Sequence, residues 1–162
     1  MPTEALAPAL PVMGLGLHYE DLPVGTRFRT IGRTVTDADI TNFVCVTGML
    51  EVLFTNLDYL EKESLIKGRL APGALVYAFA EGLLLQATMQ HTGLAFLGME
   101  LKVERPVLAG DTIHVECEVT AARQTSKPGR GIVTTHNLVR NQRGEVVLTY
   151  TPTRMLKAKA GG

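Results

Sequence analysis

The side chain of this sequence best suited to chemistry is Glu81, a single carboxylate inside an apolar run. It follows Ala80 and precedes Gly82 and Leu83, so a helix over this region would bury it. Burial disfavours the charged form of a carboxyl group and raises its pKa, which suits a general acid or base. Buried carboxylates also occur as structural partners, paired across a dimer or to a backbone amide. Because one carboxylate is weak evidence for catalysis, the structural role is preferred and Glu81 stays a candidate base.

The other polar side chains offer fewer pairings. Tyr77 lies four residues before Glu81 on the same helical face, where its hydroxyl can bond the carboxylate or its ring can pack. Cys45 and Cys117 form no CxxC pair and have no histidine at metal-ligand spacing. This argues against a zinc site and favours two buried thiols in a reducing cytoplasm.

Composition narrows the class of partner. Lys plus Arg and Asp plus Glu both number 16, so the formal net charge is zero, and aromatic residues make up 6% with no tryptophan. These values argue against nucleic-acid and membrane-surface binding and favour a small molecule or a protein. The first 17 residues hold an acid, three prolines and no positive charge, unlike a signal or transit peptide. The longest apolar run, over 74–85, is too short to cross a bilayer, so we expect a cytoplasmic protein.

The first third of the chain predicts a strand and a short helix. Arg27–Val35 is rich in β-branched and aromatic residues, which favours a strand. Thr36 and Asp39 have the spacing of a capping box, with a hydroxyl at the N-cap and a carboxylate three residues later. Apolar residues then recur at helical spacing to Thr47, and Gly48 ends the helix.

A long buried helix is predicted in the middle of the chain. Met49–Leu70 has no clean period, so we expect an irregular segment with about one helical turn, of the kind that often covers a site. Pro72 and Gly73 then introduce Ala74–His91, which is apolar on nearly every face and so predicts a helix buried on most sides. His91 suits a cap at its end.

The last third predicts antiparallel strands. Apolar and polar side chains alternate over 99–104 and 113–121, the pattern of strands with one wet face. Turn residues stand at 110–111, 126–130 and 141–144, which leaves two further strands, over 132–139 and 146–150.

This order of elements predicts an α+β fold of the hot-dog architecture, a single domain in which a curved antiparallel sheet of about five strands wraps one buried helix. We expect the domain over 18–157, a flexible tail over 1–17 and a C-terminal tail over 158–162. A sheet that covers one helix leaves an edge exposed, and such edges commonly pair. We therefore expect a homodimer or a higher homo-oligomer.

Four segments resemble the MaoC-like dehydratase family. They are Val35–Phe43 (VTDADITNF), Thr47–Asn56 (TGMLEVLFTN), Arg69–Leu75 (RLAPGAL) and Arg105–Thr112 (RPVLAGDT), and the resemblance covers Tyr19 to Lys157. It implies an enzyme of fatty acid metabolism that hydrates trans-enoyl thioesters, or dehydrates 3-hydroxyacyl thioesters, in the (R) series. CoA or an acyl carrier would hold the thioester, with no other cofactor and no metal.

The sequence departs from this resemblance at the acid–base pair. In the family an Asp and a His after the short helix share the activation of water and the proton transfers. The Asp position falls on Met49 and the His position on Phe54, and neither side chain can move a proton. Glu51 replaces a family Asn two residues from the lost Asp and could supply a displaced carboxylate. The alternative is a solvated surface residue.

The resemblance retains the residues that bind the substrate. In the family the amide that starts the central helix, here Gly73, donates a hydrogen bond to the thioester oxygen, a role that helix-start N–H groups suit. The alternative is a glycine needed only for the turn. The acyl chain would run over apolar residues, and the full predicted binding set is Gly73, Met49, Leu53, Phe54, Leu75 and Tyr77.

Three functions stay open, with an acyl-CoA or acyl-carrier thioester as the partner in each. The first is a hydro-lyase, the class that the resemblance favours, working through non-standard residues such as Glu51 and Glu81. The second is a thioesterase, because hot-dog thioesterases carry an acid eight residues after the leading helix glycine, the spacing of Gly73 and Glu81. The third is a non-catalytic subunit that binds acyl thioesters or stabilises an active homologue.

Overall fold

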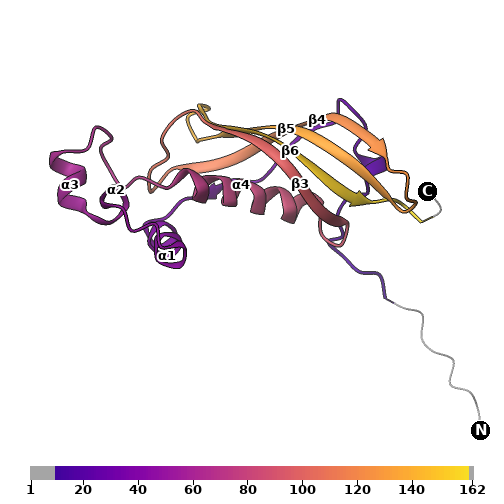
Figure 1. Ribbon diagram of the computed structural model, residues 1–162, viewed down its shortest axis with the longest axis horizontal. Coiled ribbons are helices and arrows are strands. Elements are labelled where there is room, and N and C mark those ends of the chain that lie inside the picture. Colours follow the sequence, from indigo (N-terminus) through magenta and orange to yellow (C-terminus); the bar gives the residue numbers. More distant parts are fainter. Residues whose placement is uncertain (1–9, 161–162) are drawn as a thin grey trace, which may run out of the picture.

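A long helix lying along one face of an antiparallel sheet forms the body of the molecule (Figure 1). The computed structural model describes residues 10–160. Within that range none of the helices is long and apolar enough to cross a membrane. The elements in chain order are a 3-10 turn η1 (Tyr19–Asp21), β1 (Arg27–Arg29), β2 (Arg33–Thr34), α1 (Asp37–Thr47), α2 (Val52–Thr55), α3 (Leu57–Lys62), α4 (Gly73–Thr88), β3 (Gly93–Val103), β4 (Thr112–Gln124), β5 (Arg130–Arg140) and β6 (Val146–Lys157).

The strands pair antiparallel in the order β1-β4-β5-β6-β3, and β2 pairs with β4. This confirms the predicted α+β fold of one helix on an antiparallel sheet, with six strands among the described residues where about five were expected. β4, β5 and β6 alternate buried and more exposed side chains and form the inner face. β3 pairs only with β6, so its other edge has no neighbouring strand in the described chain.

Helix α4 packs against this inner face. Its residues Val76, Ala80 and Leu84 are almost fully buried and belong to one cluster with side chains from the three inner strands, Ile113, Val115, Val139, Leu148 and Tyr150. Burying each large apolar side chain of this kind stabilises a fold by about 1.5–3 kcal/mol. The core therefore fixes the position of α4 along the sheet.

The predicted first strand is broken, whereas the predicted helix start is confirmed. Arg27–Val35 splits into β1 and β2 because the Thr30 hydroxyl, rather than a backbone carbonyl, accepts the Val115 amide at 3.0 Å. A side chain in place of a ladder carbonyl interrupts the regular pairing. In α1 the Thr36 hydroxyl accepts the Asp39 amide at 3.1 Å and the Asp39 carboxylate accepts the Thr36 amide at 2.8 Å, as the capping box predicts.

The segment Met49–Leu70 contains two short helices, more than the one helical turn that was predicted, while the rest of the segment is irregular as expected. Each helix has a side-chain cap at its N-terminus. The Glu51 carboxylate accepts the Leu53 amide at 2.7 Å, and the Asn56 carbonyl oxygen accepts the Tyr59 amide at 3.0 Å. Caps of this kind satisfy otherwise unpaired helix-start N–H groups, and they do not depend on the apolar period that the sequence analysis sought.

Helix α4 ends at Thr88, three residues before the predicted end at His91. The Thr92 amide bonds the Met89 carbonyl at 3.2 Å, which closes a turn, and His91 has a φ of 65° that a helix does not allow. His91 therefore lies in the turn before β3 and does not cap the helix.

The two cysteines are free thiols in different environments. Cys117 is buried on β4, and burial raises the pKa of its thiol to about 11. Cys45 lies on α1 and is exposed, so the prediction of two buried thiols is wrong for Cys45.

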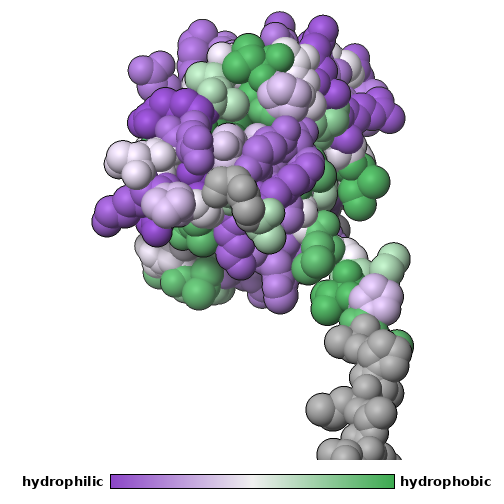
Figure 2. Space-filling view, turned by 90° about the vertical axis from the view of Figure 1, so that its right-hand side faces the viewer, coloured by the Kyte–Doolittle hydropathy of each residue, from purple (hydrophilic) through white to green (hydrophobic). Residues whose placement is uncertain are grey.

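The two chain ends, predicted as a flexible N-terminal tail and a C-terminal tail, contact the body at several described residues; residues 1–9 and 161–162 lie outside the described part. The Gly16 and Leu17 amides each bond a carbonyl at the end of α4, both at 2.7 Å. Residues 10–15 project from there with apolar side chains exposed (Figure 2). At the other end the Lys159 ammonium lies 2.5 Å from the Asp21 carboxylate.

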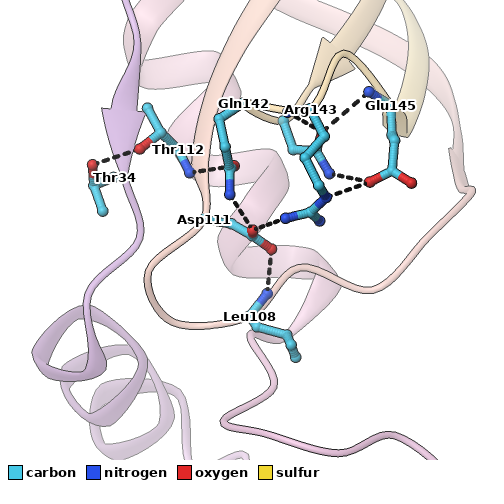
Figure 3. A network of polar contacts seen from close by, with 8 residues as sticks. Thr34, Leu108, Asp111, Thr112, Gln142, Arg143 and Glu145 are labelled. Carbon is cyan, nitrogen blue, oxygen red and sulfur yellow. Dashed lines mark hydrogen bonds and ion pairs between the residues drawn. The ribbon is translucent and has the colours of Figure 1, made fainter.

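A buried carboxylate, Asp111, joins the connection before β4 to the hairpin between β5 and β6 (Figure 3). It accepts hydrogen bonds from the Leu108 amide at 3.0 Å, the Gln142 amide group at 2.8 Å and the Arg143 guanidinium at 3.0 Å. Burial raises the pKa of Asp111, but these three donors outweigh it and leave the pKa below its ordinary value. Arg143 also bonds Glu145 at 2.8 Å, so the hairpin carries its own counter-charge.

We expect Asp111→Asn to lower the free energy of unfolding by about 1–3 kcal/mol, because donors are left without an acceptor. Because the folded-state pKa of Asp111 is lowered, its stabilisation is complete above the unfolded value of about 3.9 and is lost as pH falls through the folded value. The difference between wild type and D111N in urea unfolding should therefore shrink below about pH 4. The control is Asp58→Asn, which breaks an ion pair with Lys62 in which both side chains are exposed and should change the stability little. An equal loss of stability in the two variants would contradict the prediction.

Candidate functional site

An apolar cavity opens at the N-terminal end of α4 and is called here the helix-start cavity. Its volume is about 330 Å³, and it brings together two residues predicted from the sequence, Gly73 and Phe54. The remaining lining is mostly apolar and comes from the segment before α4, from the end of β3 and from β6: Ile66, Leu70, Ala71, Val76, Val103, Glu104, Arg105, Pro106, Val107, Val147 and Leu148.

The first turn of α4 offers unpaired N–H groups at this cavity. The Leu75 and Val76 amides both bond the Pro72 carbonyl, at 2.9 and 3.2 Å, whereas the Gly73 and Ala74 amides have no acceptor within residues 10–160. Unpaired helix-start donors carry a partial positive charge and favour an oxygen that gains negative charge. A Cβ at Gly73 would lie 3.0 Å from Val103 Cγ2, so any larger residue here would require the exposed Val103 side chain to shift. Gly73 does not have the positive φ of a glycine that a turn requires, and its role as a donor stays a prediction.

The segment before α4 is hydrogen-bonded to residues 107–109, part of the connection between β3 and β4 that Asp111 holds in place. The Ala71 amide bonds the Val107 carbonyl at 2.9 Å, and the Ala109 amide bonds the Arg69 carbonyl at 2.9 Å. Because the segment 69–71 leads directly into the helix, these bonds set the direction in which the first amides of α4 point. The position of the donors thus depends on a buried carboxylate far from them in sequence.

Arg69 holds the helices α1 and α2 at the same cavity. Its guanidinium donates to the Asp37 carboxylate at 2.8 Å, to the Thr41 hydroxyl at 3.2 Å and to the Phe54 carbonyl. The Phe54 ring packs against the main core cluster and lines the cavity. The placement of this residue depends on its backbone oxygen, and any side chain at the position would be held in the same way.

The charged residues of the lining offer little acid–base chemistry. Glu104 is the one carboxylate among the described lining residues, and its side chain turns to Lys102 at 3.0 Å and to the Thr149 hydroxyl at 3.4 Å. Sequence analysis missed Val103 to Val107 as lining. The signal was present, because the motif that begins at Arg105 follows a strand directly.

The other predicted binding residues lie around the cavity without lining it. Met49 and Leu53 are half-buried and absent from the lining. Leu75 is 2% exposed and belongs to the core cluster beneath the helix. Glu51 caps α2 with its carboxylate on the surface, as a solvated residue would.

Glu81 lies on a second cavity, an open groove of about 780 Å³ between α4, β3 and β6 that is called here the edge groove. Its Oε1 accepts hydrogen bonds from the Tyr150 hydroxyl at 3.1 Å and from the Arg154 guanidinium. The Glu81 and Arg154 side chains are 13% and 5% exposed. This is a structural pairing within one chain, rather than across a dimer or to a backbone amide.

Two tyrosines surround the pair. Tyr77, predicted to lie near Glu81, does line the edge groove, and its ring meets that of Tyr150 edge-on with centroids 5.4 Å apart. Burial first, and then the negative charge of Glu81, raise the pKa of both phenols. Both therefore stay protonated at neutral pH. Sequence analysis missed Arg154, although the period of β6 places it on the inward face, where an arginine needs a carboxylate.

Comparison with known proteins adds a family to this geometry. A family model described as MaoC like domain matches residues 21–141. Protein MaoC of Klebsiella aerogenes is 34% identical over 115 residues, which cover 70% of this chain and 33% of that protein. This chain thus spans about a third of the length of the curated relative that it matches.

Solved structures agree with the fold. The MaoC-like dehydratase from Rhodospirillum rubrum is 31% identical and matches with a TM-score of 0.77, covering 89% of this chain and 99% of that chain. A Mycobacterium tuberculosis protein with a double hotdog fold is 22% identical and matches with a TM-score of 0.80, covering 91% of this chain and 46% of that chain. The second likeness shows the fold alone, and it confirms the predicted hot-dog architecture.

We expect Glu81→Gln to lower the free energy of unfolding by about 3–5 kcal/mol, because it leaves the buried Arg154 charge without its counter-ion. Arg154→Met should cost a similar amount, and the double variant should lose clearly less than the two single losses added together. Urea unfolding of the four proteins measures this coupling. Additive losses would mean that the pair contributes nothing to stability.

Proposed function

This chain belongs to the MaoC-like domain family, and from that premise we propose that it binds an acyl thioester, of the enoyl or 3-hydroxyacyl type, in the helix-start cavity. The observation that carries the proposal is an apolar cavity lined by Gly73, whose amide, like that of Ala74 next to it, has no acceptor among the described residues. A thioester needs such a place, with donors for its carbonyl oxygen and apolar walls for its chain. CoA or an acyl carrier in the cytoplasm holds the thioester.

The family points to hydration or dehydration of the thioester. This chain has the cavity and the helix-start amide that would bind the substrate, but not the acid–base pair. Addition of water to an enoyl thioester needs a group that takes a proton from water and one that delivers a proton to carbon. The resemblance puts Met49 and Phe54 at those two positions, and the carboxylate of Glu104, which lines the cavity, is paired with Lys102. We therefore expect this protein to bind an acyl thioester but to hydrate it slowly.

A thioesterase that uses Glu81 has less support. Glu81 lines the edge groove rather than the helix-start cavity, and its Oε1 is occupied by Arg154 and Tyr150. Its Oε2 has no hydrogen-bond partner among the described residues, but the ion pair with Arg154 favours a structural role, and the unpaired helix-start amide of Gly73 lies at the other cavity.

We expect hydration of crotonyl-CoA to run at least ~10²-fold below that of a relative with the Asp/His pair, the usual contribution of one positioned acid–base group. Loss of the enoyl absorbance under saturating substrate measures it, and the relative assayed in parallel is the control. Ordinary hydratase turnover would contradict the proposal, and Glu51→Gln would then test whether the exposed carboxylate of Glu51 carries the chemistry.

We expect acyl-CoA affinity to rise with chain length by up to ~0.8 kcal/mol per buried CH₂, because each added methylene leaves water for apolar walls. The rise should level off once the cavity of about 330 Å³ is filled. Calorimetric titration with butyryl-, octanoyl- and palmitoyl-CoA measures both features.

The matched variants for this titration lie on one helix. Gly73→Val places side-chain atoms where Val103 already lies 3.0 Å from a Cβ, so it should abolish binding. Ala87→Val is exposed on the same helix and lines neither cavity, so it should bind as wild type does. Equal binding by both variants, or none by wild type at millimolar ligand, would show that the cavity holds no acyl thioester.

The free edge of β3 supports a homodimer. Large apolar side chains along this strand are 39–53% exposed, on both of its faces: Leu94, Phe96, Leu97, Met99, Leu101 and Val103. An unpaired strand edge with apolar flanks is a template for pairing with a second strand. Two copies joined antiparallel along β3 would extend the sheet and cover these side chains.

A further inference from the structure

A short apolar arm leaves the body at the end of α4. Residues 10–17 contain no charged side chain, and four of their large apolar side chains are 53–88% exposed: Leu10, Val12, Met13 and Leu15. Figures 1 and 2 show the arm running away from the sheet and the helix. Exposed apolar side chains gathered on one segment mark a surface that is covered by a partner.

The base of the arm is fixed to the body. The Gly16 amide bonds the Gln90 carbonyl and the Leu17 amide bonds the Thr88 carbonyl, both at 2.7 Å. A Cβ at Gly16 would lie 2.5 Å from the Thr88 oxygen, so this close approach admits only glycine. The arm therefore starts from a defined point, beside the turn that leads into β3 at Gly93.

This point lies far from the helix-start cavity of the same chain. The 16 residues of α4 span about 24 Å, and the cavity lies at the opposite end of the helix from Thr88. Leu10, six residues before Gly16, can reach about 20 Å from the base, which is short of the length of α4. The arm runs away from the helix and the sheet (Figure 1), so it does not cover its own cavity.

If a second copy pairs along β3, the base of the arm of one copy comes close to the helix-start cavity of the other. In an antiparallel pair the start of one strand lies beside the end of the other. Gly93 of one copy would then lie near the partner's Val103, which is exposed at the rim of the helix-start cavity. The bases of the two arms would stand at the mouths of the two cavities.

We propose that residues 10–15 form an exchanged arm that lies over the helix-start cavity of a second copy and closes it over the acyl chain. The inference rests on the proposed function, because it takes the dimer and the cavity from there. The occupant is a second copy rather than a membrane surface, because residues 10–17 have no Lys or Arg to attract anionic lipid. Each site would then be completed by apolar side chains from the partner.

Disulfide trapping tests the contact. In a Cys45→Ser background, oxidation of the double variant Met13→Cys/Val103→Cys should give a covalent dimer on a non-reducing gel. Each single variant and the pair Met13→Cys/Leu94→Cys should stay at the monomer position, because Leu94 lies at the other end of β3. Failure of the Met13/Val103 pair to cross-link, in a protein that sediments as a dimer, would overturn the arm and leave the dimer standing.

Truncation tests the effect on the site. A variant without the residues before Gly16 should still sediment as a dimer but should bind octanoyl-CoA about tenfold more weakly, the loss expected when one large apolar side chain leaves its contacts. Unchanged affinity would overturn the arm as part of the site. A wild-type monomer at micromolar concentration, or no binding by the wild-type protein, would refute the dimer or the cavity of the proposed function instead.

Discussion

The structure depends on a helix that is apolar on more faces than one sheet can cover. α4 buries Leu75, Val76, Ala80 and Leu84 against the sheet, yet Leu85 on the same helix stays 42% exposed beside the edge groove. A single layer of strands covers one side of a helix and leaves the rest to solvent or to a partner. The free edge of β3, the open groove and the apolar arm all lie around this uncovered side. In all three places, apolar surface near α4 is left without protein to cover it.

The connection between β3 and β4, which Asp111 holds, orients the first turn of α4. Burial along the sheet fixes the axis of α4 but leaves the direction of its first turn free. That direction is set by the bonds between 69–71 and 107–109, and Asp111 holds the second of these segments against the β5–β6 hairpin. The lowered pKa of Asp111 reflects three donors that meet at one carboxylate. Asp111, which does not line the cavity, thus helps to place the Gly73 and Ala74 amides through these backbone bonds.

The fold was predictable to the extent that it rests on local patterns. The capping box at Thr36, the all-round apolar helix and the period-two strands each follow from neighbours in sequence, and all three are present. The site residues that sequence analysis missed depend on contacts between distant segments. Arg154 lies 73 residues from Glu81 and meets it only because β6 passes over α4. The exposure of β3 on both faces is likewise a property of what fails to cover the strand, which no pattern within the strand records.

The contacts that hold the cavity do not involve the side chains at the two acid–base positions, so the proposed binding role does not require that pair. The Arg69 guanidinium donates a hydrogen bond to the Phe54 carbonyl, and the Pro72 carbonyl accepts hydrogen bonds from the Leu75 and Val76 amides in the first turn of α4. Neither contact involves the side chain at position 49 or 54, so these side chains can change while the backbone stays in place. An apolar side chain at either position removes a proton donor or acceptor and adds apolar surface near the cavity, which favours an acyl chain over water. Under the proposed function, apolar side chains at positions 49 and 54 therefore disfavour hydration and favour acyl-thioester binding.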